Sequence, residues 1–115
     1  MTEDKYVPEL GVRVIAIDMD GTLCESQCFT EEECKNALPR QAVIDKVNEL
    51  YKFKYVVINT ARSYVLAEAT LLWLDRHNVS YHAISFKKTQ LHLLIDDKVM
   101  HVDAFLDDAV DVRKL

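Results

Sequence analysis

Residues 12–22 read Val-Arg-Val-Ile-Ala-Ile-Asp-Met-Asp-Gly-Thr, a β-branched run that ends abruptly in an acidic turn. The run is too uniformly apolar for a strand with one face in water. It therefore predicts a central parallel strand over residues 12–17, buried on both faces. Asp18 and the residues after it would lie at the carboxyl end of that strand, where open parallel sheets bind their ligands.

Strands and helices alternate along the rest of the chain. Short apolar runs indicate strands, whereas apolar residues that recur at intervals of three and four indicate helices. The alternation indicates parallel βαβ units and hence a doubly wound α/β sheet. The further predicted strands cover residues 55–59, 80–85 and 91–95, and the predicted helices cover residues 41–51 and 65–78.

The length of 115 residues predicts one domain over residues 1–115, with an N-terminal tail (1–11), a core (12–102) and a C-terminal segment (103–115). The formal net charge is −5, which argues against a broad nucleic-acid-binding face. The longest apolar runs are far shorter than the ~20 residues that span a bilayer. We therefore expect a cytoplasmic protein without a membrane segment.

Cys24, Cys28 and Cys34 fall within eleven residues of one another. Their spacing has no nearby fourth metal ligand, and the four histidines are scattered along the chain. The odd number of cysteines favours reduced thiols in the cytoplasm over disulfides, and we expect such thiols here rather than a zinc site.

Polar side chains follow three of the predicted strands. The first ends in Asp18 and Asp20, the second is followed by Thr60, and the strand over 91–95 is followed by Asp96 and Asp97. Four carboxylates at one sheet edge would repel one another unless a cation offsets them. Hard oxygen ligands favour Mg²⁺, and a nearby lysine and hydroxyl suit a phosphoryl group.

Each of these features also has an ordinary structural explanation. Thr60 could be a satisfied strand-end hydroxyl, Lys88 a solvated loop charge, and Asp96 with Asp97 a helix N-cap. Their joint occurrence, each after its own strand or in a connecting loop, favours a site for phosphoryl transfer.

These residues resemble the motifs of the haloacid dehalogenase superfamily of aspartate-nucleophile phosphatases. Residues 18–22 look like its first motif, Thr60 its second, Lys88 its third, and Asp96-Asp97 its fourth. The likeness covers about residues 12–102 and is strongest to a small capless subgroup described as capsular polysaccharide biosynthesis phosphatases. The subgroup tends to read Gly-Lys-Pro where this chain reads Lys87-Lys88-Thr89, so either lysine could reach the phosphate, and register favours Lys88.

The resemblance implies a Rossmann-like core and a two-step reaction. Asp18 would be the nucleophile that forms an aspartyl-phosphate, and Asp20 would act as general acid and then general base. Mg²⁺ would be bound by Asp18, the Asp20 carbonyl and Asp96, with Asp97 either a ligand through water or the partner of Lys88. The groups implied to hold the phosphoryl oxygens or the substrate are Thr60, Lys88, Met19, Gly21, Ala61, Arg62 and Lys87.

In this superfamily a lid is inserted after the first motif or between the second and third. Residues 22–39 are 18 in number and residues 62–88 are 27, which leaves no room for a lid domain. The expected substrate is a sugar phosphate or a similar phosphorylated metabolite. Two alternatives stay open: a phosphatase acting on nucleic-acid ends, and a non-catalytic scaffold. A receiver domain is disfavoured because it has no acidic pair after its lysine.

The predicted helix over residues 65–78 is apolar over more than one face. Its expected inward face contains Leu66, Ala69, Leu72 and Trp73, yet Leu71 and Leu74 are apolar as well. The surplus surface would be covered either by a second copy of the chain or by the monomer's own core. The sequence leaves both arrangements open.

Overall fold

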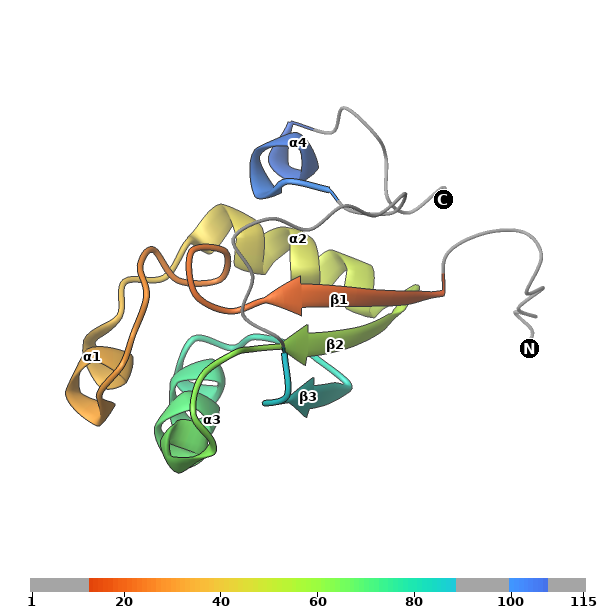
Figure 1. Cartoon of the computed structure of the whole chain (residues 1–115). Helices are drawn as coiled ribbons and strands as arrows, with labels where there is room; N and C mark the ends of the chain where they lie inside the picture. The colour runs from red at the N-terminus through yellow and green to blue at the C-terminus, as the bar shows by residue number, and fades with distance from the viewer. Residues whose placement is uncertain (1–12, 89–99, 108–115) are drawn as a thin grey trace.

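A three-stranded parallel sheet in the order β1-β2-β3 forms the centre of the structure (Figure 1). The computed structural model describes residues 13–88 and 100–107. Along the chain, the elements are β1 (Val14–Asp18), α1 (Glu31–Asn36), α2 (Gln41–Tyr51), β2 (Tyr55–Asn59), the 3₁₀ helix η2 (Tyr64–Leu66), α3 (Ala67–Arg76), β3 (Ala83–Ser85) and α4 (Val102–Leu106).

The strands are paired in register at their carboxyl ends. Asp18 of β1 lies opposite Asn59 of β2, which lies opposite Ser85 of β3. All three arrows in Figure 1 point toward the side where the chain leaves β1 for the loop that leads to α1. The parallel βαβ arrangement thus brings the residues that follow each strand to one edge of the sheet.

The first strand differs from its prediction in its exposure. Among the described strands β1 lies at the edge of the sheet, and Val14 is 55% exposed. The sequence predicted a strand buried on both faces. The predicted strand over residues 91–95 lies outside the described residues.

Helix α2 lies where the sequence predicts a helix, over residues 41–51, whereas α1 is a further short helix that was not among the predicted ones. The acidic run that opens α1 lies in its first turn, where carboxylates interact favourably with the helix dipole, and Thr30 caps the helix by accepting a hydrogen bond from the Glu33 N–H. Helix α2 buries the apolar positions Val43, Ile44, Val47 and Leu50. The prediction of α2 is therefore confirmed, and α1 is explained by its cap and its acidic first turn.

The helix predicted over residues 65–78 begins instead as a 3₁₀ turn and ends at Arg76. Its buried face is also rotated relative to the prediction: Leu66, Thr70, Trp73 and Leu74 are buried, whereas Leu72 is 59% exposed. Thr70 is buried because its hydroxyl accepts a hydrogen bond from Arg62. A tertiary polar contact therefore overrides the apolar pattern.

Trp73 of α3 is fully buried, and its indole N–H donates a 2.9 Å hydrogen bond to the carbonyl of Ala37. This bond ties α3 to the segment that leads from α1 into α2. Helix α1 packs beside α3 as well. The long connection between β1 and α2 is therefore anchored on the same core as the sheet.

No helix in residues 13–88 or 100–107 is long and apolar enough to cross a membrane.

Candidate functional site

Asp18 ends β1 at the carboxyl edge of the sheet, and its carboxylate is 39% exposed. One carboxylate oxygen, Oδ1, accepts a 2.8 Å hydrogen bond from the N–H of Met19. The same oxygen forms a 2.9 Å ion pair with Nζ of Lys88. Asp18 is thus oriented by its own main chain and faces a cation at an accessible edge.

The chain turns tightly directly after β1. The carbonyl of Met19 accepts hydrogen bonds from the N–H groups of three successive residues, Thr22, Leu23 and Cys24, at 3.2, 2.9 and 3.2 Å. Gly21 has a φ of +81°, a backbone conformation that residues with a Cβ atom rarely adopt. The Met19 side chain itself is fully buried, so its main chain, and not its side chain, faces the turn.

Lys88 reaches Asp18 because its own main chain is attached to the strand-end loop of β2. The N–H of Lys88 donates to the carbonyl of Thr60 at 3.3 Å. Lys87 is exposed, and its N–H donates to the Ser85 hydroxyl. The structure therefore brings Lys88, the lysine that the sequence register favoured, to Asp18.

Thr60 follows β2 and is almost completely buried. Its N–H donates to the carbonyl of Ser85 at 2.9 Å, and its hydroxyl oxygen accepts from the N–H of Arg62 at 3.1 Å. Among residues 13–88 and 100–107 the hydroxyl donates to no protein group, so its proton can serve a bound ligand. Ala61 lies half-buried between these two residues.

Asp20 is bound by Arg62. The Arg62 Nη2 lies 2.7 Å from Asp20 Oδ1, and its Nε lies 3.1 and 3.2 Å from the two carboxylate oxygens. The Arg62 side chain is completely buried and that of Asp20 is 9% exposed. Burial alone would lower the pKa of Arg62, but the hydrogen bonds and charge of Asp20 raise it above its usual value. Arg62 therefore stays charged beside Asp20.

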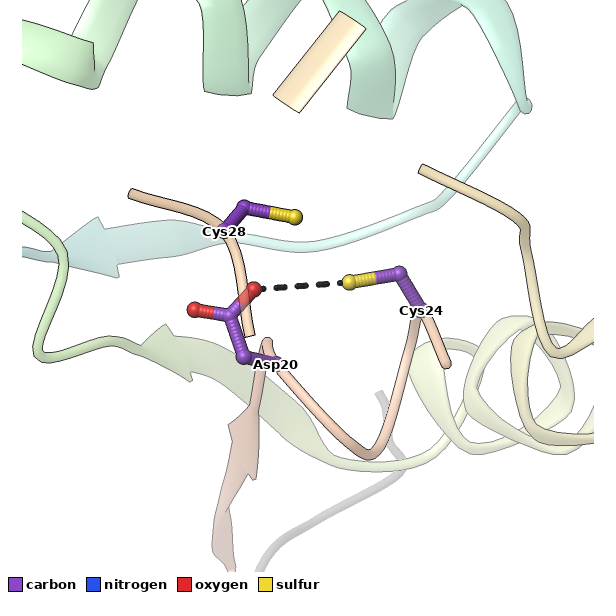
Figure 2. A group of neighbouring side chains, drawn as sticks. All are labelled: Asp20, Cys24 and Cys28. Atoms are coloured by element: carbon purple, nitrogen blue, oxygen red, sulfur yellow. Dashed lines mark hydrogen bonds between the residues drawn. The ribbon is translucent and has the colours of Figure 1, made fainter. Parts of the chain in front are cut away.

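Two thiols complete the surroundings of Asp20 (Figure 2). The Cys24 thiol donates to Asp20 Oδ1 at 3.4 Å, and Nη2 of Arg62 lies 3.6 Å from the Cys24 sulfur. Burial, reinforced by the charge of Asp20, raises the pKa of Cys24 to about 12. Burial also raises the pKa values of Cys28 and Cys34. None of the three cysteines forms a disulfide bond within the described residues.

A pocket of about 270 Å³ opens beside this cluster. Asp20, Cys28 and Arg62 contribute to its wall, and the remaining lining residues are Gln27, Phe29, Ala61, Ser63 and Leu66. The pocket gives a small molecule or ion access to the carboxylate of Asp20.

Two of the predicted site residues, Asp96 and Asp97, lie outside the described residues. Of the others, the structure brings Asp18, Lys88 and Thr60 to one edge, and it places Asp20 with Arg62 beside them. Sequence reasoning did not anticipate the contact of Asp20 with Cys24 and Cys28. The i, i+4 and i, i+8 spacing of those cysteines from Asp20 was a usable signal, since a tight turn such as that around Met19 folds such positions together.

Comparison with solved structures finds chains that share the fold of this protein. A crystal structure of a structural-genomics target from Vibrio cholerae superposes with a TM-score of 0.72 at 26% identity, covering 89% of this chain and 94% of that chain. Two further structures contain a chain with a similar fold, and both are structures of the Pnkp1/Rnl/Hen1 complex, which one of them describes as an RNA repair complex. Their chains superpose on this one with TM-scores of 0.57 and 0.58.

The two chains from the Pnkp1/Rnl/Hen1 complex are 17% and 19% identical in sequence to this chain. The aligned region spans 32% and 36% of the length of those chains. At that identity the likeness concerns the fold alone. No family model matches the sequence, and no curated protein matches it either.

Proposed function

We propose that this chain is a magnesium-dependent phosphomonoester hydrolase of the haloacid dehalogenase type, with a doubly wound core and no lid domain. The observation that carries the proposal is the 2.9 Å pair between Asp18 and Lys88 at the carboxyl edge of the sheet, with Asp20 two residues further on. A nucleophilic carboxylate, a cation for the phosphoryl oxygens and a proton-transfer group are thus collected at one accessible edge.

In the first step, a carboxylate oxygen of Asp18 bonds to phosphorus while the bond between phosphorus and the ester oxygen breaks. The departing oxygen takes a proton from Asp20. In the second step, Asp20 takes a proton from water, whose oxygen bonds to phosphorus as the bond to Asp18 breaks. Inorganic phosphate leaves and both aspartates are restored.

Arg62 and Thr60 support these steps from below the surface. The guanidinium contacts both oxygens of Asp20 and fixes the direction of that carboxylate. The hydroxyl of Thr60 and the amine of Lys88 are the donors that would bind the phosphoryl oxygens, together with the main chain near Gly21 and Ala61. Lys87, which is exposed, would contact the rest of the substrate.

The chemistry of the donor set fits magnesium. Both described contacts of Asp18 fall on Oδ1, and this half-exposed carboxylate supplies the hard oxygen that Mg²⁺ prefers. The Asp20 carbonyl and Asp96 would be the further ligands, with Asp97 bound through water or paired with Lys88. Bound Mg²⁺ would neutralise charge on the carboxylate and the phosphoryl group.

The proposed substrate is a sugar phosphate or a similar metabolite, because the chain is acidic overall and the pocket beside Asp20 is of small-molecule size. Phosphate removal from nucleic-acid ends is the second candidate. The fold likeness to chains of an RNA repair complex favours it, and a site without a lid would admit a polymer end.

A turnover panel tests the proposal. The full chain is assayed with Mg²⁺ on sugar phosphates, nucleotides and oligonucleotides phosphorylated at either end, against a chelated control and the Asp18→Asn variant. We expect turnover that both the chelator and the substitution abolish. If no phosphomonoester is hydrolysed above the chelated control, the hydrolase proposal fails and the scaffold alternative replaces it.

A further inference from the structure

Asp20, Cys24 and Cys28 form a cluster of donor atoms that the proposed reaction does not explain (Figure 2). One carboxylate oxygen and two sulfurs lie within 4.8 Å of one another, and the contact between Cys24 and Asp20 measures 3.4 Å. In a tetrahedral zinc site, with Zn–S near 2.3 Å and Zn–O near 2.1 Å, neighbouring ligand atoms lie about 3.6 Å apart. Small side-chain rotations would therefore bring the three atoms around one ion.

The types of ligand select the class of metal. Two cysteine sulfurs and one carboxylate oxygen suit Zn²⁺ or its softer analogue Cd²⁺, whereas Mg²⁺ and Ca²⁺ are bound by oxygen ligands alone. This cluster thus differs in chemistry from the oxygen ligands around Asp18.

The charges also balance. Two thiolates and the Asp20 carboxylate carry three negative charges, and a divalent ion with the buried Arg62 guanidinium carries three positive ones. Arg62 contacts both Asp20 and the sulfur of Cys24. It would serve as the hydrogen-bonding partner that orients metal ligands from outside the coordination sphere.

The cluster has an entry path and an open coordination position. Asp20 and Cys28 line the pocket of about 270 Å³, so an ion can reach them from solvent. Three protein ligands leave the fourth tetrahedral position for water, as in zinc sites that are not closed.

We infer that Asp20, Cys24 and Cys28 form a binding site for a thiophilic divalent cation, of which Zn²⁺ is the physiological example. This inference replaces the expectation of thiols without a metal, because the fold supplies a carboxylate ligand that the cysteine spacing alone did not show. Binding replaces the S–H bonds of the two thiols with metal–sulfur bonds and releases two protons to solvent. An ion bound to Asp20 would keep that carboxylate from transferring protons and would therefore inhibit the proposed hydrolysis. Only this inhibition rests on the proposed function; the binding of the ion does not.

Titration of the metal-free full chain with Cd²⁺ tests the site, because Cd–thiolate bonds absorb in the ultraviolet. We expect a charge-transfer band that saturates at one Cd²⁺ per chain and that Zn²⁺ displaces. Cys24→Ser and Cys28→Ser should each lose it. Cys34→Ser is the matched control, since Cys34 is a third buried thiol outside the cluster, and it should keep the band.

Two further measurements keep the result interpretable. X-ray absorption on the zinc-loaded wild-type chain should show two sulfur neighbours at about 2.3 Å, which does not depend on any variant folding. Asp18→Asn should bind Cd²⁺ like the wild type, so a failed hydrolase proposal leaves this test intact. Absence of sulfur neighbours, or equal binding by the Cys24→Ser and Cys28→Ser variants, overturns the site.

Discussion

The guanidinium of Arg62 contacts both carboxylate oxygens of Asp20 from a completely buried position, 42 residues further along the chain. The contact joins the turn after β1 to the loop after β2, and a third nitrogen of Arg62 extends it to Thr70 in α3. Two loops at the sheet edge and helix α3 are therefore joined by one side chain.

Arg62→Ala should destabilise the fold strongly. Removal of one partner from a buried ion pair costs about 3–5 kcal/mol, because the remaining charge stays buried without compensation. Urea unfolding followed by circular dichroism measures the change. The control is Lys52→Ala, which removes an exposed pair to Glu49 and should change the free energy of unfolding by less than about 0.5 kcal/mol. Equal stability of the two variants would show that the buried pair is energetically unimportant.

Substitution of the two aspartates should separate their proposed roles. Asp18→Asn removes the nucleophile and should abolish turnover. Asp20→Asn keeps the main-chain carbonyl but removes proton transfer, with a loss of about 10²- to 10⁴-fold in kcat. It also removes the charge that compensates Arg62, so the same urea experiment is used to show that the variant is folded under the assay conditions. Steady-state kinetics on the best substrate of the panel measures both, and wild-type activity in Asp18→Asn contradicts the covalent mechanism.

Lys88→Met should reduce turnover far more than Lys87→Met. Of these two lysines, Lys88 is the one whose amine pairs with Asp18 in the described residues, and removal of one donor to the transferring group commonly costs about 10²- to 10³-fold in kcat. The two variants remove the same charge from adjacent positions, so each is the control for the other. A larger loss in Lys87→Met would mean that the loop presents the other lysine to the substrate.

The Cys24 thiol should resist alkylation in the folded protein. Its pKa is raised from 9.0 to about 12, so below pH 9 the reactive thiolate is about 1,000-fold scarcer than in the unfolded chain. Because the pKa of Cys24 is higher in the folded state than in the unfolded chain, its thiol stabilises the folded state below pH 9. That contribution to the free energy of unfolding is lost as the pH rises toward 12. Iodoacetamide labelling at pH 8, with and without urea and read by mass spectrometry, measures the protection. Fast labelling of Cys24 without urea would contradict it.

We propose that subunits associate and help to cover the open site. The proposal rests on exposed apolar side chains in η2 and on the outer face of α3. Val65 and Leu72 are 77% and 59% exposed, and Leu71 is 40% exposed. Burial of all of them within the monomer, the alternative left open by the sequence, does not occur in the described structure. Light scattering at micromolar concentration should give a mass above 13.3 kDa that Leu72→Glu lowers. A mass of 13.3 kDa at every concentration would exclude association.

Much of the fold follows from short-range patterns in the sequence. Strand β2 and helix α2 lie where β-branched runs and helical spacing predict them. The burial of Thr70 in place of Leu72 did not follow, because it depends on a hydrogen bond from a residue in another segment.

The candidate site divides in the same way. The placement of Asp18, Thr60 and Lys88 at one edge follows from the rule that parallel strands collect their carboxyl ends. The contact of Arg62 with Asp20 and the proximity of the two thiols depend on side-chain directions across a turn. Spacing alone does not give those directions, so the sequence left Arg62 among the substrate-binding groups and the thiols without a role.

The hydrogen bond between Trp73 and the Ala37 carbonyl gives the protein a built-in optical reporter. Trp73 is the sole tryptophan in the sequence, and its buried indole touches the segment that links the cysteine-bearing loop to α2. Its emission therefore originates from one place, and it shifts to longer wavelength when that segment separates from α3 and admits water. The ring of His77, 4.3 Å away, adds a neighbour whose charging quenches the same light. Burial and the charge of Arg76 lower the pKa of His77, so the quenching begins only at a pH below the usual range for histidine.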